Sequence, residues 1–179
     1  MPKRQVFFSF DYDEDVMRVA QVKNIGAIEG ETIVSTNEWE TIKRGGDEAI
    51  KRWIDYNMTN RSCLVVLIGK KTHKSRWVDY EIKKAWNDGK GIVGIYIHNL
   101  KDPRTGTTVQ GENPFKHIYI NQYTKKIEDS FHGLLYNPVQ PLSLFVRCFE
   151  PVWYDAYGDI RDNLESLIEE AVTRRKTIN

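Results

Sequence analysis

The chain has 179 residues, which is the usual size of one domain with a single substantial core. Its 26 Lys and Arg against 25 Asp and Glu leave a formal net charge of +1, which excludes the strongly basic character of a dedicated nucleic-acid-binding protein. Hydrophobic residues make up 40% and aromatic residues 12%, so a disordered chain is excluded as well.

The two cysteines, Cys63 and Cys148, lie inside apolar runs, which is typical of buried thiols and not of a secreted disulfide framework. The first residues lack the apolar segment of a signal peptide, and no stretch approaches 18 apolar residues. We therefore expect a cytoplasmic protein that neither crosses nor binds a membrane.

The apolar runs along the first hundred residues alternate between short continuous ones and longer ones with helical spacing, which predicts βαβ units. In chain order the pattern predicts a strand over Gln5–Phe10, a helix from Asp13 to Lys23, a helix from Asp47 to Asn57, a strand over Ser62–Gly69, a helix from Trp77 to Trp86 and a strand over Gly91–His98. Both faces of Ser62–Gly69 are apolar, so this strand is expected at the centre of the sheet.

The remaining segments carry weaker patterns. Residues 27–44 show no clean period, and residues 99–140 form a proline-interrupted stretch with one short strand predicted around His117–Ile120. A closing amphipathic helix is predicted from Asp155 to about Arg174. Together the elements predict an α/β fold with a doubly wound, mainly parallel sheet, in which ligands bind at the carboxyl ends of the strands.

One carboxylate stands out on the predicted helix after the central strand. On a helical projection Trp77, Val78 and Ala85 all lie on the same side as Glu81, so this charge is placed among apolar neighbours. Such a position is costly unless the carboxylate is paired or used. Glu81 either extends to the edge of the apolar stripe and pairs with a nearby lysine (Lys74 or Lys84), or lies in the ligand cleft with Trp77 as an apolar wall.

An acidic cluster, Asp11 to Asp15, follows the first predicted strand. Capping and charge compensation of the next helix is the favoured interpretation over metal binding, although Asp11 and the backbone from Ser9 could also line the cleft. Arg18, one turn further on, either pairs with Glu14 or Asp15 or contacts an anionic phosphate. The lysines around residues 70–74 and 83–84 form a basic rim that would favour a phosphate-bearing small molecule.

Several common motifs are absent from the sequence. It has no glycine-rich dinucleotide fingerprint, no phosphate loop, no Cys-x-x-Cys, no zinc-protease motif and no serine-hydrolase elbow. The four histidines are dispersed, so no metal site is predicted.

Two segments resemble motifs of TIR domains. Val6-Phe-Phe-Ser-Phe-Asp-Tyr12 is similar to their first-strand motif, and Ser75-Arg-Trp-Val-Asp-Tyr-Glu81 is similar to their Ser-x-Trp-x-x-x-Glu motif. Together with Arg18–Gly26, the strand Leu64–Gly69 and the Gly-Glu-Asn-Pro-Phe segment at residues 111–115, the chain resembles the TIR-like subunit of bacterial Thoeris anti-phage systems.

The resemblance implies a flavodoxin-like fold and an NAD⁺ nucleosidase or ADP-ribosyl cyclase that uses NAD as substrate and needs no further cofactor. Nicotinamide would be released, and the product would be a cyclic ADP-ribose isomer that activates a separate effector protein. The resemblance makes Glu81 the catalytic residue and Trp77 its partner in the motif. It places Ser9, Phe10 and Asp11 in a loop that faces the nicotinamide-ribose side of the site.

The chemistry of the reaction is compatible with a single carboxylate. Nicotinamide leaves a pyridinium as a neutral molecule, so no general acid is required, unlike in the hydrolysis of ordinary glycosides. An ionised Glu81 would bind the ribose hydroxyls and stabilise the positively charged transition state. Phe10, Tyr12 and Trp77 are candidates for an apolar wall that keeps water away, and Arg18 is a candidate ligand of the phosphates.

We expect a single TIR-like domain over residues 1–179, with a core of about residues 4–120 and a C-terminal extension of about residues 121–179. The expected partners are NAD, a separate effector and further copies of the chain, but no nucleic acid. Two alternatives stay open at this stage: a non-catalytic TIR-type interaction module, and an enzyme similar to nucleoside deoxyribosyltransferases.

Overall fold

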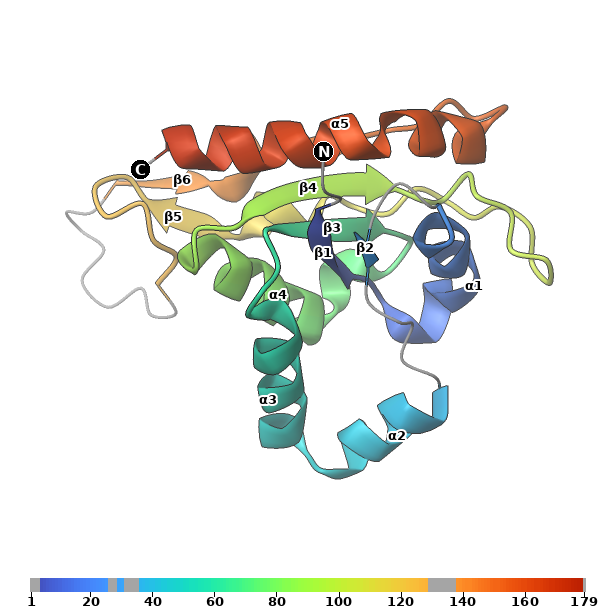
Figure 1. The fold of residues 1–179 in the computed structure, drawn as a ribbon, viewed down its shortest axis with the longest axis horizontal. Helices are drawn as coiled ribbons and strands as arrows, with labels where there is room; N and C mark the ends of the chain where they lie inside the picture. The colour runs from blue at the N-terminus through green and yellow to red at the C-terminus, as the bar shows by residue number, and fades with distance from the viewer. Residues whose placement is uncertain (1–3, 26–28, 31–35, 129–137, 179) are drawn as a thin grey trace.

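Five parallel strands form the central sheet of the computed structural model, which describes residues 4–25, 29–30, 36–128 and 138–178. The strands are β1 (Gln5–Ser9), β2 (Glu29–Gly30), β3 (Cys63–Ile68), β4 (Gly91–Tyr96) and β7 (Arg147–Phe149). Their order is β2-β1-β3-β4-β7, so β3 is central, as its apolar faces predict (Figure 1). Every residue of β3 is buried.

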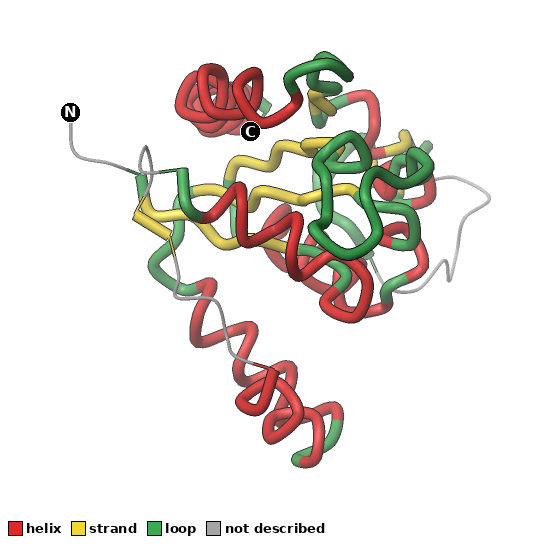
Figure 2. The backbone as a smooth tube through the Cα atoms, turned by 90° about the vertical axis from the view of Figure 1, so that its right-hand side faces the viewer, coloured by secondary structure: helices red, strands yellow, loops and turns green. Residues whose placement is uncertain are grey.

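Helices cover both faces of the sheet. On one face lie α1 (Tyr12–Lys23) and α5 (Ala156–Thr177), and on the other lie α3 (Asp47–Met58) and α4 (Arg76–Asn87). Figure 2 shows the strands as a layer between α5 and the helices of the opposite face. The side chains of the strands alternate between two apolar clusters, one against each pair of helices. The predicted α/β, doubly wound architecture is thus confirmed.

Local sequence explains where the helices begin. The Asp11 side chain accepts a hydrogen bond from the backbone N–H of Asp13 and caps α1, which confirms the capping interpretation of the acidic cluster for this residue. Ser75 caps α4 in the same way, since its side chain accepts from the backbone N–H of Val78. Both caps follow the carboxyl ends of strands, so both helices begin at the same edge of the sheet.

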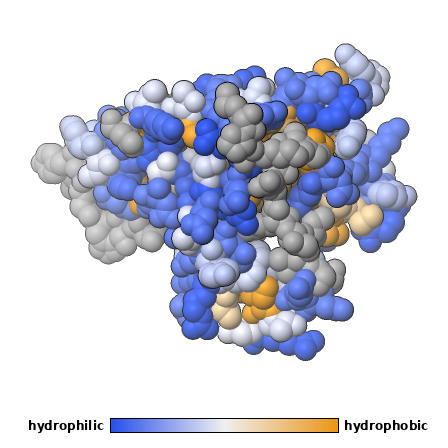
Figure 3. Space-filling view, in the orientation of Figure 1, coloured by the Kyte–Doolittle hydropathy of each residue, from blue (hydrophilic) through white to orange (hydrophobic). Residues whose placement is uncertain are grey.

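The prediction of no regular structure over residues 27–44 is wrong for the part that the structure describes. The two-residue strand β2 and the helix α2 (Thr36–Arg44) lie there, while residues 26–28 and 31–35 are outside the described residues. α2 packs on α3 and extends away from the sheet (Figure 1). Figure 3 shows hydrophobic side chains at the surface between α2 and α3 on an otherwise mostly hydrophilic face.

The second half of the chain adds to the sheet and to its cover. The strand predicted around His117–Ile120 is β5 (Tyr119–Asn121), which pairs antiparallel with β6 (Val139–Pro141), and residues 129–137 are outside the described residues. Three short 3-10 helices, η1 (Thr72–Lys74), η2 (Pro114–His117) and η3 (Leu142–Leu144), lie in connections. β7 was not predicted, and the closing helix extends to Thr177. Among the described helices, none is long and apolar enough to cross a membrane.

Candidate functional site

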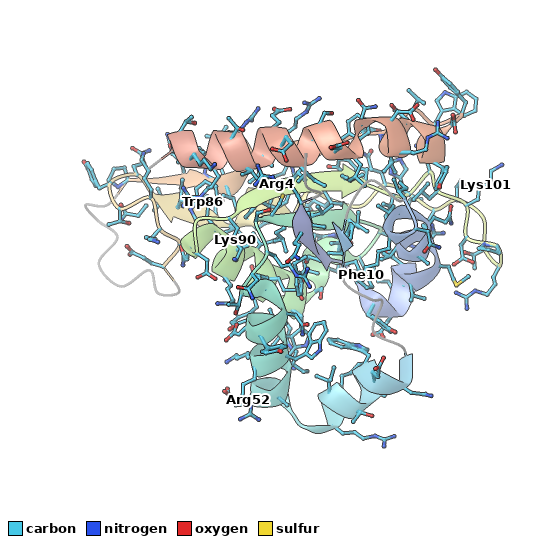
Figure 4. The ribbon with its side chains drawn as sticks, viewed as in Figure 1. Arg4, Phe10, Arg52, Trp86, Lys90 and Lys101 are labelled. Carbon is cyan, nitrogen blue, oxygen red and sulfur yellow. The ribbon has the colours of Figure 1, made fainter. Side chains whose placement is uncertain are left out.

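A cleft opens at the carboxyl end of β1, where α1, α2, α3 and α4 all contribute side chains. Its empty space is about 870 Å³ when the open solvent at its mouth is included. Its walls are mainly aromatic, with three acidic groups, Asp11, Asp13 and Glu81, and two lysines. Figure 4 labels Phe10, which follows β1 and lies between the sheet and α2.

Glu81 lies on α4 and is only 7% exposed, although it lines the cleft. The Ser9 hydroxyl, at the end of β1, donates a hydrogen bond of 2.5 Å to Glu81 Oε2. Ser9 itself is fully buried, so this contact fixes the carboxylate against the sheet. Because Val78 and Ala85 on the same helix are buried, Glu81 is held in an apolar setting with one edge open to the cleft.

Trp77 lies one helical turn before Glu81 and lines the same cleft. Its indole meets the Tyr80 ring edge to face at 6.3 Å, and the Arg76 guanidinium lies 4.6 Å from the indole centroid. The Ser75 cap, which begins α4, also lines the cleft. The first turn and a half of α4 therefore presents a wall and a carboxylate to one space.

The segment after β1 supplies the adjoining wall. Phe10, Asp11 and Tyr12 all line the cleft, and the Phe10 and Tyr12 rings are stacked with centroids 5.7 Å apart. Burial is the main cause that raises the pKa of Asp11, and the negative charges of Asp13 and Glu14 raise it further. The carboxyl group of Asp11 is already used as the helix cap of α1.

Sequence reasoning missed several residues that line the cleft, namely Lys23, Trp39, Lys43 and Trp53. Trp39 and Lys43 come from α2, and the Trp39 ring stacks on Tyr12 with centroids 5.5 Å apart. Trp53, on α3, meets both Trp39 and Phe7 edge to face. The spacing of Trp53 in the predicted α3 face indicates burial, but no local pattern indicates that α2 folds back to meet it.

Arg18 lies outside the lining of this cleft. Its guanidinium forms an ion pair with Asp15 at 3.2 Å and donates to the backbone carbonyls of Leu100 and Gly106. Of the two roles predicted for Arg18, the structure shows the pairing, which connects α1 to the loop after β4. Burial raises the pKa of Asp15 to about 6 despite the charge of Arg18.

His98, at the end of another predicted strand, and the basic rim contribute little to the cleft. His98 is buried, and burial lowers its pKa, but it does not line the cleft. Three of the five lysines of the basic rim have carboxylate partners of their own: Lys71 pairs with Glu14, Lys83 with Asp79, and Lys84 with Asp88. Within the described part of the chain, no group of three or more His, Cys, Asp or Glu side chains could hold a metal ion.

Comparison with known proteins gives two findings. The family described as "Thoeris protein ThsB, TIR-like domain" matches residues 7–102, more than half of the chain, and this range includes every residue of the cleft. A Bacillus cereus (strain MSX-D12) protein named "Putative cyclic ADP-D-ribose synthase ThsB1" is 36% identical over 120 residues, which cover 64% of this chain. The aligned region spans 62% of the length of that relative. The chain therefore belongs to the family of Thoeris ThsB proteins with a TIR-like domain.

Proposed function

We propose that this protein cleaves NAD at the bond between nicotinamide and ribose and joins the ends of the remaining ADP-ribose into a cyclic isomer. The cyclic product would act as a signal to a separate effector protein in anti-phage defence. The observation that carries the proposal is a nearly buried carboxylate, Glu81, held by Ser9 in a cleft with aromatic walls. Membership of the ThsB family and the name of the Bacillus relative support it.

The first step requires stabilisation of positive charge and not a proton donor. As the bond from ribose C1′ to the nicotinamide nitrogen breaks, its electron pair leaves with nicotinamide, which becomes neutral, and the ribose gains oxocarbenium character. A carboxylate beside that ribose stabilises the developing charge, more strongly where water is excluded. Glu81 is suited to this role, because it lines the cleft and only 7% of it is exposed to water.

Ser9 contributes by orientation. Its hydroxyl donates a hydrogen bond to Glu81 Oε2, and this contact restricts the rotation of the carboxylate. In this proposal the Glu81 carboxylate accepts hydrogen bonds from the ribose hydroxyls. Trp77, one helical turn before Glu81, lines the same cleft and keeps water from the reacting carbon.

The second step is a competition for ribose C1′. A nucleophile on the adenosine half of the same molecule, either a ring nitrogen or a hydroxyl that gives its proton to solvent, forms the new bond and closes the ring. If water attacks instead, linear ADP-ribose results. Cyclisation is therefore favoured by holding the molecule folded in a dry cleft.

The test is to incubate the purified protein with NAD and to measure nicotinamide and ADP-ribose products by chromatography and mass spectrometry. We expect Glu81→Gln to reduce nicotinamide release by at least about a hundredfold, the usual effect of removing a charge-stabilising group. Glu165→Gln is the matched control, because Glu165 is exposed on α5 and lies outside the cleft. Equal thermal unfolding of both variants would show that the loss is not due to unfolding.

Two results would contradict the proposal. One is full activity of Glu81→Gln, which would remove Glu81 from the mechanism. The other is no NAD loss from the unchanged protein, either purified or in extracts of phage-infected cells that express it. In that second case, turnover of deoxynucleosides would identify the transferase alternative, and its absence would leave an interaction module.

A further inference from the structure

The cleft has a second distinctive region besides Glu81, a set of stacked rings that we call the aromatic wall: Phe10, Tyr12 and Trp39. Tyr12 lies between the other two, with ring centroids 5.7 Å from Phe10 and 5.5 Å from Trp39 and interplanar angles of 29° and 30°. The first two rings follow β1 and the third comes from α2. Segments separated in the chain thus build one layered surface.

These rings are not part of a closed core. All three are only partly buried, and all three line the cleft. Half-buried aromatic rings that face an open space leave apolar surface in contact with water, which is unfavourable unless something covers it. A flat aromatic base suits such a surface, because every nucleobase has a π-face that stacks on aromatic side chains.

Two lysines of the cleft lie beside the same rings. Lys23 Nζ is 5.4 Å from the centroid of Phe10, and Lys43 Nζ is 5.8 Å from the centroid of Trp39. Lys43 also pairs with Glu40 at 2.9 Å and lies 3.6 Å from Asp13, which itself lines the cleft. Aromatic rings with adjacent ammonium groups are suited to a base that carries phosphates.

The aromatic wall is also close to Glu81 along the chain. Ser9, which holds Glu81, is three residues before Tyr12, so their Cα atoms lie within about 11 Å of each other. Both regions line one cleft, so a single dinucleotide can place its ribose at Glu81 and its base at the wall. Ring closure needs the dinucleotide to bind in a folded form.

We propose that the aromatic wall is the adenine subsite of the cleft and that Trp39 binds the base so that the adenosine half of the molecule reaches ribose C1′ before water does. This proposal rests on the proposed function. It adds an assignment of the base to one surface, and it makes Trp39 a determinant of whether the product is cyclic or linear.

Binding provides the first test, in a background in which substrate turnover is expected to be at least about a hundredfold slower. In Glu81→Gln protein, isothermal titration calorimetry would compare NAD with nicotinamide mononucleotide, which lacks the adenosine half. We expect Trp39→Ala to weaken NAD binding by about tenfold or more and to change mononucleotide binding by less than about twofold. Trp39→Phe should restore most of the NAD affinity, because it restores an aromatic face.

The matched control is Trp153→Ala, which removes an indole that is 78% exposed and lies outside the cleft, and which should change neither affinity. If Trp39→Ala lowers the melting temperature, Tyr12→Leu tests the same wall from the segment after β1. Equal weakening of NAD and mononucleotide, or no weakening of NAD by either substitution, would overturn the assignment.

Product analysis provides the second test, with Glu81 intact. We expect Trp39→Ala to shift the products of NAD from cyclic towards linear ADP-ribose. An unchanged ratio of cyclic to linear product would remove Trp39 from ring closure. If the unaltered protein cleaves no NAD, the proposed function fails, whereas the calorimetric comparison still decides whether the wall binds adenine.

Discussion

Ser9 and Asp11 are separated only by Phe10, yet the structure uses their oxygen atoms in opposite ways. The Ser9 hydroxyl donates to Glu81 across the sheet and is completely buried. The Asp11 carboxylate accepts from a backbone N–H and stabilises the start of α1. A strand end rich in polar residues therefore combines one residue that orients the candidate catalytic group with one that builds the scaffold.

Asp15 is the buried acid from which we derive a pH-dependent prediction. It is 1% exposed, its partner is Arg18, and Asp11 and Glu14 add negative charge nearby. Because burial raises its pKa to about 6, the folded protein keeps a proton between about pH 4 and pH 6 that the unfolded chain has released. The contribution of Asp15 to stability is thus complete at low pH and is lost as the pH rises through about 6.

The measurement is the free energy of unfolding of the wild type and of Asp15→Asn by urea denaturation from pH 4.5 to pH 7.5. We expect the wild-type value, relative to the variant, to fall by on the order of 2 kcal/mol across this range. A difference that stays constant or grows with pH would show that the charge of Arg18 outweighs burial, and that the pKa of Asp15 is not raised.

At the scale of elements, α4 was predictable and α2 was not. The apolar residues of α4 recur with helical spacing over twelve residues, between a serine cap and an Asn-Asp-Gly stop, so each local signal agrees. α2 has nine residues, is rich in polar side chains and offers only Trp39 and Ile42 as apolar groups that pack on the core. Its position depends on packing against α3 and Tyr12, which no local pattern indicates.

The candidate site divides in the same way. Glu81 and Trp77 could be selected because they share a face of α4 next to the end of a strand, and Ser9 to Tyr12 because they follow another strand. Trp39 and Lys43 could not be selected, because their helix is brought to the cleft only by tertiary packing. The part of the site that follows β1 and β3 in the chain was thus predictable, and the part on α2 was not.

Arg175 tests how α5 is held on the sheet. This arginine is 5% exposed, its guanidinium carbon lies 4.4 Å from the Trp86 ring centroid, and it donates to the Trp86 carbonyl at 3.1 Å. We expect Arg175→Ala to lower the free energy of unfolding by about 2 kcal/mol, because a buried cation–π contact and a charged hydrogen bond are lost.

Arg174→Ala is the matched control for that substitution. Arg174 is the preceding residue, is exposed, and pairs only with Glu170 one turn away among the contacts that the structure describes. We expect its removal to cost no more than about 0.5 kcal/mol. Equal effects of the two substitutions in urea denaturation would show that the end of α5 is not anchored through Trp86.

At the scale of the whole molecule, the fold includes elements that lie beyond the residues matched by the family. The match stops at residue 102, before β7 and α5. β7 nevertheless pairs with β4, and α5 packs along β3 and β4 and against α1. The expected division into a core of about residues 4–120 and an extension of about residues 121–179 stays a prediction, and this packing argues against treating the second part as an addition to a finished core.

Truncation after residue 120 decides the point. α5 contributes seven buried apolar side chains to the cluster on its face of the sheet: Ala156, Ile160, Leu164, Leu167, Ile168, Ala171 and Val172. At about 1.5–3 kcal/mol for each of the larger ones, their loss removes as much free energy as a domain of this size has in total. We expect residues 1–120 to be insoluble or to lack a cooperative unfolding transition by circular dichroism, whereas the full chain shows one. A cooperative transition in the truncated chain would mean that β1, β3 and β4 are stable when α1 alone covers one face of the sheet, and that α5 serves a purpose other than completing the core.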